Sequence, residues 1–351
     1  MILSVQVSFL LLFLYCFMKN HCHTFLTIFI TTLLVSCTKE ITLDDLPGIQ
    51  DKIVVEGSIE TNSPPLIFLT KNFPYYGDYN LNDISSYFIH DAIVKVHSSD
   101  NEEVVLKEFC SRDFIGVLSA AQKTNLFRVF GFNYSLDSII KYGDSAKFLP
   151  NICFYAPEDI LFYYISGKSK FMGKEKTSYT LDIVKDTTHI TALTTIPTTI
   201  RPIGLSYKAH PNATNDSLVT VFVELHVPDT FGNFIRYWTK RNQESFFLPR
   251  SRSVWDDKLW VGSSIRLPLE RGQPRRTKLD DTYSYFWRDD TVHLKWANID
   301  KKAYDFWSAV ERDNGDNPLS SPILVKSNIQ GGLGVWAGYS ISTLKLYIPK
   351  K

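Results

Sequence analysis

The chain is organised as short apolar runs separated by polar turns, a pattern that predicts β-strands. Around Val94 and Val96 the apolar positions recur with a period near two, and the turn SSDNEE and the run VVLKEF that follow complete a β-hairpin. Further strand signals are IVVEGSIE, PPLIFLTKNF, TSYTLDIVKD, THITALTTIP, SLVTVFVELHV, GNFIRYWTKR, KLWVGSSIRLPL, YSYFWR and TVHLKWANI. We therefore expect a mainly β protein.

One segment has helical periodicity instead, NIDKKAYDFWSAVERDN, which predicts a C-terminal amphipathic helix at about 298–312. Asn298 or Asp300 can cap it. Its apolar face consists of Ile299, Ala303, Phe306, Trp307 and Val310. We expect this face to pack on a sheet. The less regular region 111–170 contains SAAQKTNLFRVF, which predicts a second, short helix.

The segment MKNHCHTFLTIFITTLLVSC, Met18–Cys37, has the layout of a secretory signal. Lys19 and two histidines precede an apolar stretch at 25–35, and LVSC follows. This resembles the bacterial lipobox, which implies cleavage before Cys37 and lipidation of that cysteine. A transmembrane anchor is the alternative, but an apolar run of about 11 residues is shorter than the roughly 20 that cross a bilayer. Residues 1–17 are apolar and uncharged. The simplest interpretation is that translation begins at Met18, and the alternative interpretation is that residues 1–17 form an additional membrane segment.

These patterns predict four parts. Residues 1–36 form the signal region, and residues 37–51 form a polar tether between the lipid and the first strand. An N-terminal β-sandwich-like domain is expected over 52–110 and a larger β-rich domain over 111–351. The predicted fold class is therefore mainly β, with two β-sandwich-like domains and few helices.

The charge balance bears on the class of partner. The formal net charge is +1, and removal of residues 1–36 takes away Lys19 and no other charged residue, which leaves a neutral chain. Nucleic-acid binding needs a concentrated cationic face, so we expect no nucleic-acid partner.

Few residues suggest chemistry. In the mature chain only Cys110 and Cys153 accompany Cys37, and they either form one disulfide or remain buried thiols. No histidine has zinc-ligand spacing and no Gly-x-Ser-x-Gly motif occurs, so we expect no metal, no cofactor and no catalytic residue. The sequence DNGDN at 313–317 is a candidate calcium loop, but we favour a helix-ending turn.

Four glycines in SNIQGGLGVWAGYS, residues 327–340, raise the question of a phosphate-binding loop. A P-loop requires a lysine after its last glycine, and a dinucleotide fingerprint requires a different spacing followed by a helix, so neither fits. We interpret the glycines as sheet architecture. Gly331 and Gly332 allow positive φ. Gly334 and Gly338 permit close approach within a bulged or kinked strand, LGVWAGYSIS, and TLKLYIP is expected as the last strand.

The segment NPLSSPILVKSNIQGGLGVWAGYS also resembles the C-terminal signature of a family of Bacteroidota lipoproteins catalogued as domain of unknown function 4249. Other segments resemble the family in the expected order, namely CTKEITLDDLPGIQDKIVVEGSIETNSPPLIFLTKNFPYYG, YTLDIVKDTTHITALTTIP, VPDTFGNFIRYW and WDDKLWVGSSI. The resemblance covers nearly all of 37–349 and is weakest over 111–170. It implies a β-sandwich-rich lipoprotein of the outer membrane, often encoded beside TonB-dependent transporters, and it assigns no catalytic residue. TKE after Cys37 partly resembles a surface-export signal, which favours the cell surface over the periplasmic face.

Two aromatic loops are the candidates for contact with a ligand or partner. FPYYGDY contains Tyr75 and Tyr76, and VWDDKLW contains Trp255 and Trp260. Exposed aromatic side chains beside carboxylates suit stacking on a sugar or peptide, or insertion into a partner's pocket. The alternative, which we favour, is that these side chains close the open ends of a sandwich core.

Taken with the resemblance, these features predict a non-enzymatic, lipid-anchored protein of the outer membrane, exposed at the cell surface. The expected role is accessory to TonB-dependent nutrient uptake, as a ligand-capturing or transporter-docking subunit. A structural or assembly factor of the cell envelope is one alternative. A hydrolase with a dispersed active site is another, because the spacing of catalytic residues in sequence does not constrain their positions in space.

Overall fold

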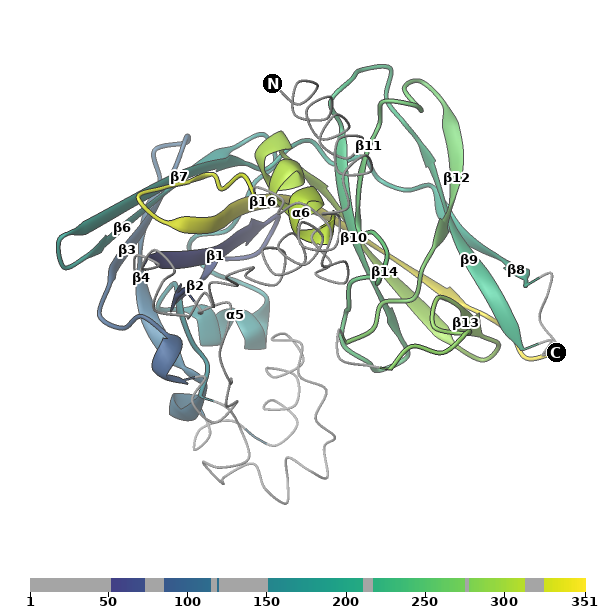
Figure 1. Cartoon of the computed structure of the whole chain (residues 1–351), viewed down its shortest axis with the longest axis horizontal. Helices are drawn as coiled ribbons and strands as arrows, with labels where there is room; N and C mark the ends of the chain where they lie inside the picture. Colours follow the sequence, from purple (N-terminus) through teal and green to yellow (C-terminus); the bar gives the residue numbers. More distant parts are fainter. Residues whose placement is uncertain are drawn as a thin grey trace, which may run out of the picture. The chain divides into compact units, whose positions relative to one another are not determined.

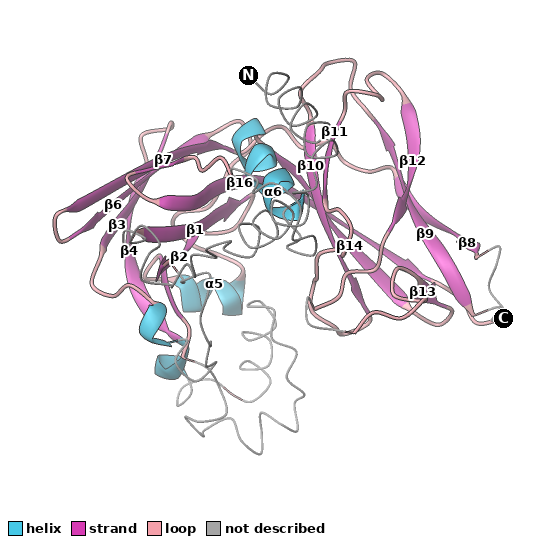
Figure 2. Cartoon of the chain, viewed as in Figure 1, coloured by secondary structure: helices cyan, strands magenta, loops and turns pink. Residues whose placement is uncertain are grey.

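The computed structural model describes residues 52–72, 85–114, 119, 151–210, 217–274, 278–312 and 325–351. Strands dominate this part of the chain, so the predicted mainly β fold is confirmed. In Figure 2 the helices, in cyan, make up a much smaller part of the described chain than the strands, in magenta. The predicted signal region, the whole tether, all but the first residue of the predicted helix SAAQKTNLFRVF, and the loop DNGDN lie outside the described residues.

Strands occur in both halves of the described chain. The first half contains β1 (Ile53–Glu60), β2 (Leu66–Lys71), β3 (Ile93–Ser98), β4 (Glu103–Cys110), η3 (Ser111–Phe114), β5 (Cys153–Ala156), α5 (Ile160–Ser166), β6 (Ser178–Lys185) and β7 (Thr188–Thr195). The second half contains β8 (Gly204–Ala209), β9 (Leu218–His226), β10 (Phe234–Arg241), β11 (Val254–Asp256), β12 (Ser264–Leu269), β13 (Phe286–Trp287), β14 (Thr291–Ile299), α6 (Lys301–Arg312), β15 (Ile329–Gln330) and β16 (Leu333–Tyr347).

The strands form two sheets. The larger has twelve strands in the order β11-β10-β14-β16-β1-β2-β5-β4-β3-β6-β7-β15. Within it, residues 333–339 of β16 pair in parallel with β1, and residues 339–347 pair antiparallel with β14 (Figure 1). The smaller sheet has four strands, with β9 between β8 on one edge and β12 and β13 on the other.

The larger sheet curls around a first hydrophobic core. Strand β16 of this sheet contacts β6 and β7 across the core. The Trp336 indole donates a hydrogen bond to the Tyr179 carbonyl (2.9 Å), and the Gly338 amide donates one to the Thr194 hydroxyl (2.8 Å). The buried side chains of the first core include Val55, Ile59, Ile67, Leu69, Val94, Val96, Leu181, Ile183, Ile190 and Trp336.

A second core lies between the smaller sheet and β10, β14 and the end of β16. Figure 1 shows β9 and β12 facing β10 and β14 across it, the arrangement of a β-sandwich. Alternate residues of the facing strands are buried there. They include Val219, Val221, Val223, Leu225, Ile235, Tyr237, Val292, Leu294 and Trp296.

The described strands do not divide into two domains at residue 110. From the predicted N-terminal domain, β1 pairs with β16 near the end of the chain, and β4 pairs with β5. Residues 51–351 form one compact unit. The predicted division into 52–110 and 111–351 is therefore replaced by two cores that share one sheet.

The glycines of the C-terminal motif are structural, as predicted. At Gly334 φ is +103°, and a Cβ atom there would lie 2.0 Å from the Val55 carbonyl oxygen. Gly338 faces β7, where a Cβ atom would lie 2.9 Å from backbone atoms. Two details differ. Gly331 has a positive φ of 81° but Gly332 does not. LGVWAGYSIS and the first five residues of TLKLYIP belong to one continuous strand, which ends at Tyr347.

The helix α6 occupies most of the segment predicted as amphipathic. It begins at Lys301 because Asp300 caps it, its carboxylate accepting a hydrogen bond from the Ala303 amide over 2.8 Å. Asn298, the other candidate cap, lies in β14, and its side-chain oxygen accepts a hydrogen bond from the Ile200 backbone amide. The helix packs on β10 and β16, with Ala303 and Ala309 buried.

Most predicted strands are present, including the hairpin β3–β4. The sequence reasoning missed β5, β8, β11 and α5, which are short and lack a clear alternation. Among the described residues, no helix combines the length and apolar character needed to span a membrane.

Candidate ligand-binding site

A cavity of about 610 Å³ opens on the face of the larger sheet that points away from both cores. Its floor comes from the neighbouring strands β10, β14, β16, β1 and β2, and α6 forms a wall. This volume lies within the roughly 300–1,000 Å³ of small-molecule sites. The side chains that give it polar and aromatic character are Glu60, Arg236, Trp238, Lys295, Trp307 and Tyr339.

Strand alternation explains why these side chains meet. On β10, Ile235 and Tyr237 enter the second core, so Arg236 and Trp238 point to the opposite face. On β14 the same rule leaves Lys295 on the cavity face, directly paired with Trp238. The cavity is therefore lined by the reverse sides of strands whose other sides are fixed by core packing.

Arg236 lies at the centre of the site and is only 4% exposed. Its guanidinium carbon is 3.6 Å from the centre of the Trp307 ring and 5.0 Å from that of Trp238. Its Nε donates to the Ser253 hydroxyl over 3.4 Å, and one Nη donates to the Tyr339 hydroxyl over 3.3 Å. The cation is thus held by aromatic rings and neutral hydroxyls, and it forms no ion pair with any described residue.

Tyr339 connects α6 to the sheet. Its hydroxyl accepts hydrogen bonds from the Trp307 indole (2.9 Å) and from Arg236. Burial raises the pKa of Tyr339, while Arg236 and the two hydrogen bonds oppose this rise, so the hydroxyl keeps its proton at neutral pH. Because both of its contacts come from donors, that proton remains available to donate.

Lys295 carries the second positive charge of the cavity. Its ammonium donates to both oxygens of Glu60, over 2.6 and 2.8 Å, and lies 5.3 Å from the centre of the Trp238 ring. The two side chains are about a quarter exposed. The Lys295 charge is therefore compensated within the protein, unlike that of Arg236.

Glu311 of α6 is the carboxylate linked to Arg236 through one intervening group. It accepts hydrogen bonds from the Ser253 hydroxyl and from the Ser253 amide, the latter over 3.0 Å. Ser253 in turn accepts from Arg236, so the two charges are separated by a hydroxyl. This arrangement orients the guanidinium and offsets its charge only in part.

The sequence-predicted contact residues lie elsewhere. Trp255 and Trp260 are half-buried and pack against the second core, their ring centres 5.9 Å apart. Both side chains thus contribute to the packing of the second core, and their contact with a ligand or partner stays a prediction. Leu259, beside Trp260, is 86% exposed. Tyr75, Tyr76 and the predicted lipidation site Cys37 lie outside the described residues.

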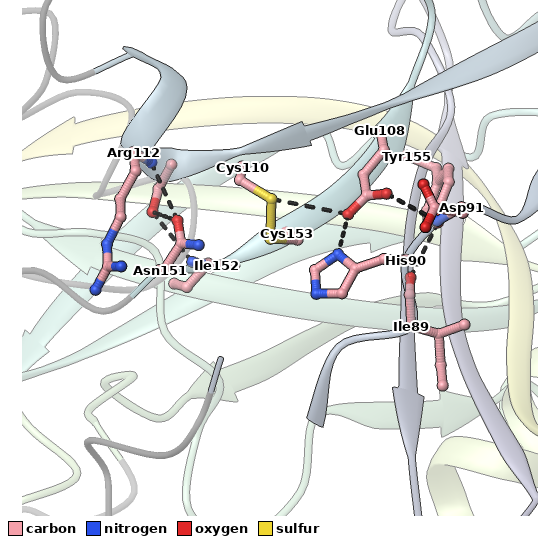
Figure 3. Close-up of a disulfide and its surroundings, with 11 residues drawn as sticks. Ile89, His90, Asp91, Glu108, Cys110, Arg112, Asn151, Ile152, Cys153 and Tyr155 are labelled. Atoms are coloured by element: carbon pink, nitrogen blue, oxygen red, sulfur yellow. Dashed lines mark hydrogen bonds and ion pairs between the residues drawn. A yellow bond between two sulfur atoms is a disulfide. The ribbon is translucent and has the colours of Figure 1, made fainter. Parts of the chain in front are cut away.

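Cys110 and Cys153 form a disulfide between directly paired positions of β4 and β5 (Figure 3), so the first of the two alternatives holds. Ligand atoms of His90 and Glu108 lie within 4.8 Å of the sulfurs. Figure 3 shows Glu108 between His90 and the disulfide, with Tyr155 beyond it. Because the sulfurs are bonded to each other, neither is a thiolate, and only two metal-ligand side chains remain in this group.

The sequence reasoning missed the whole cavity. The sequence did contain a sign of it: in GNFIRYWTKR and TVHLKWANI, Arg236 and Lys295 are charged residues within otherwise mostly apolar predicted strands. That signal gives the face of each strand but not the strand order, and the order places Arg236, Lys295 and Tyr339 around one cavity.

A comparison with family models assigns the chain to a family. Residues 38–345 match the model described as domain of unknown function (DUF4249). No curated protein is significantly similar to the chain. Because the match extends over most of the sequence, from before β1 into β16, the chain belongs to the DUF4249 family.

Proposed function

We propose that this chain is a non-enzymatic, lipid-anchored protein of the outer membrane that captures a small molecule for a TonB-dependent transporter. The cavity around Arg236 is the observation that carries the proposal. It combines aromatic and aliphatic walls with a few convergent polar groups, the usual character of a small-molecule site.

The rigidity of the cavity supports a binding role. Arg236, Trp238 and Lys295 project from paired strands, and Trp307 projects from a helix joined to the sheet through Tyr339. Side chains held in this way need little ordering when a ligand enters, so less binding free energy is lost.

The proposed outer-membrane location and the proposed transporter partner rest on the lipobox-like segment and the family resemblance. Attachment of a lipid at Cys37 would hold the cavity at the membrane, where a captured ligand is passed to a transporter over a short distance.

Purification of the tagged protein from native membranes in mild detergent tests this proposal. Mass spectrometry should identify a diacylated or triacylated Cys37 peptide and a TonB-dependent transporter in stoichiometric amount. Cys37→Ser is the control, which should lose the lipid and the membrane fraction together. A lipidated protein recovered without a transporter would contradict the uptake role.

A second candidate function, a structural subunit of an envelope assembly, is favoured by two exposed apolar side chains. Phe231 is 78% and Leu259 86% exposed. Hydrogen bonds link the two loops, since the Asp257 carboxylate accepts one from the Gly232 amide and one from the Asn233 amide, each over 3.1 Å. The double variant Phe231→Ser, Leu259→Ser separates the two functions. It should weaken envelope integrity on every nutrient if the assembly role holds, and leave growth unchanged if it does not.

A further inference from the structure

We infer that the ligand of the cavity carries a carboxylate group, which Arg236 binds. This inference rests on the proposed function, since it specifies what the cavity captures. It follows from three properties of the site: a buried cation that has no direct ion pair with a described residue, an excess of hydrogen-bond donors, and two tryptophan rings close to the cation.

The first property is the charge of Arg236. A buried cation is costly unless an anion or several good acceptors compensate it. Arg236 is 4% exposed, and its hydrogen bonds to neutral hydroxyls are long, at 3.3 and 3.4 Å. Glu60 is already paired with Lys295, Glu311 lies behind Ser253, and Glu56 at the cavity lining is solvent-exposed. A ligand anion would complete the compensation.

The second property is the set of unused donors. Arginine has five N–H groups, and the contacts with Ser253 and Tyr339 use two of them. The remaining donors include those of the terminal fork, which matches the two oxygens of a carboxylate. The Tyr339 hydroxyl accepts from two donors, so its own proton is also free to donate.

The third property concerns the rest of the ligand. Trp238 and Trp307 both lie close to Arg236, and Trp238 meets the Tyr339 ring edge-on, with ring centres 5.8 Å apart. Such faces favour a planar or ring-shaped body attached to the charged group. Arg236 is the cation of the lining that has no direct ion pair with a described residue, which suits a monoanion. A phosphate dianion would bring a second negative charge into a cavity that Glu56 and Glu60 already line. The geometry therefore favours a ring-bearing monocarboxylate.

Benzoate and its neutral isostere benzamide test the inference in the full mature chain in detergent. Tryptophan fluorescence and calorimetry should detect benzoate at concentrations where benzamide does not bind. A bidentate, charge-assisted pair corresponds to about a 10- to 100-fold difference in affinity. Arg236→Met should remove this difference, and Arg236→Lys should retain only part of it because lysine lacks the planar fork.

The matched control is Arg252→Met, which removes an exposed arginine that lies over Trp255. It should bind benzoate like the parent. The thermal stability of Arg236→Met adds a readout that does not involve binding. It should equal or exceed that of the parent without ligand, because the variant removes a buried charge that has no direct ion pair with a described residue.

The outcomes separate this inference from the proposed function. Equal affinity for benzoate and benzamide, with both lost in Arg236→Met, would overturn the carboxylate assignment and leave a ligand-binding cavity. Marked destabilisation of Arg236→Met with no preference for benzoate would assign Arg236 a structural role. Failure of both probes to bind would overturn the carboxylate assignment and the capture function together.

Discussion

At the scale of single residues, Tyr339 has the most consequential hydroxyl group of the cavity. It is the common acceptor for Trp307 of α6 and Arg236 of β10. We predict that Tyr339→Phe lowers the free energy of unfolding by about 1–3 kcal/mol, because two buried donors lose their acceptor. Chemical denaturation measures this change.

The matched control is Tyr347→Phe, the same substitution at an exposed tyrosine of the same strand. Its hydroxyl bonds Asp289 at the surface over 3.0 Å, so the change should stay within about 0.5 kcal/mol. Equal effects of the two substitutions would refute the bridging role of Tyr339.

Residue-scale features were the least predictable from sequence. Strand alternation assigns Arg236 and Trp238 to one face of β10, but nothing local shows that α6 covers that face. The aromatic loop of Trp255 and Trp260 was recognised from its composition, and its side chains pack against the second core. Exposed and buried aromatic residues look alike in a sequence because both follow apolar patterns.

At the scale of elements, the start of β16 depends on close approach to β1. A Cβ atom at Gly334 would lie 2.0 Å from the Val55 carbonyl oxygen, and φ there is +103°. We predict that Gly334→Ala costs more than about 2 kcal/mol of stability through backbone strain and displaced pairing.

Gly204→Ala in β8 is the control for this prediction, since a Cβ atom there meets nothing within 4 Å and φ is not positive. Thermal or chemical unfolding should show little change for it. A tolerated alanine at Gly334 would contradict the parallel register between β1 and β16.

A second element-scale prediction concerns a row of three basic residues across β10, β14 and β16. Lys240, His293 and Lys345 are directly paired in register. Partial burial, followed by the charges of Lys240 and Lys345, lowers the pKa of His293. The unfolded chain therefore binds the proton more tightly than the folded one, and stability falls as the pH drops through about 6.5 toward the lowered value.

Unfolding measured from pH 8 to pH 5 should show a smaller loss of stability in His293→Gln than in the parent. Lys345→Gln should give an intermediate slope, because it removes one of the like charges beside the imidazole. Identical slopes of stability against pH in all three proteins would show that protonation of His293 beside the two lysines does not lower the stability.

Sequence reasoning predicted the elements well where periodicity was long. The hairpin β3–β4, the long strands and most of α6 carry clear periods, and their inner faces are fixed by burial. It missed the four-residue β5 and the three-residue β11, because so few positions cannot establish a period.

At the scale of the whole molecule, β16 makes the two cores interdependent. Its first half contributes Trp336 to the first core, and Leu344 and Leu346 pack on the second. We predict one cooperative unfolding transition, with Leu181→Ala in the first core and Val223→Ala in the second shifting the same midpoint. Leu181→Ala should cost about 2–5 kcal/mol.

Tryptophan fluorescence and far-ultraviolet circular dichroism should give coincident curves for these variants. Two separated transitions, each moved by only one substitution, would show that the cores fold independently and that β16 does not couple them.

The boundary predicted at residue 110 failed at this scale for a definite reason. Local patterns place strands but do not show which distant strands pair, and β1 meets a strand from the opposite end of the chain. The family resemblance was found from sequence because it depends on ordered motifs rather than on pairing.

The most direct test of the central claim is dialysis of the full mature chain and of Arg236→Met against a metabolite extract, followed by mass spectrometry of the retained compounds. We predict that the parent enriches compounds that share a carboxylate on a ring-bearing body, and that the variant does not retain them. Retention of the same compounds by both proteins, or enrichment of neutral compounds alone, would contradict it.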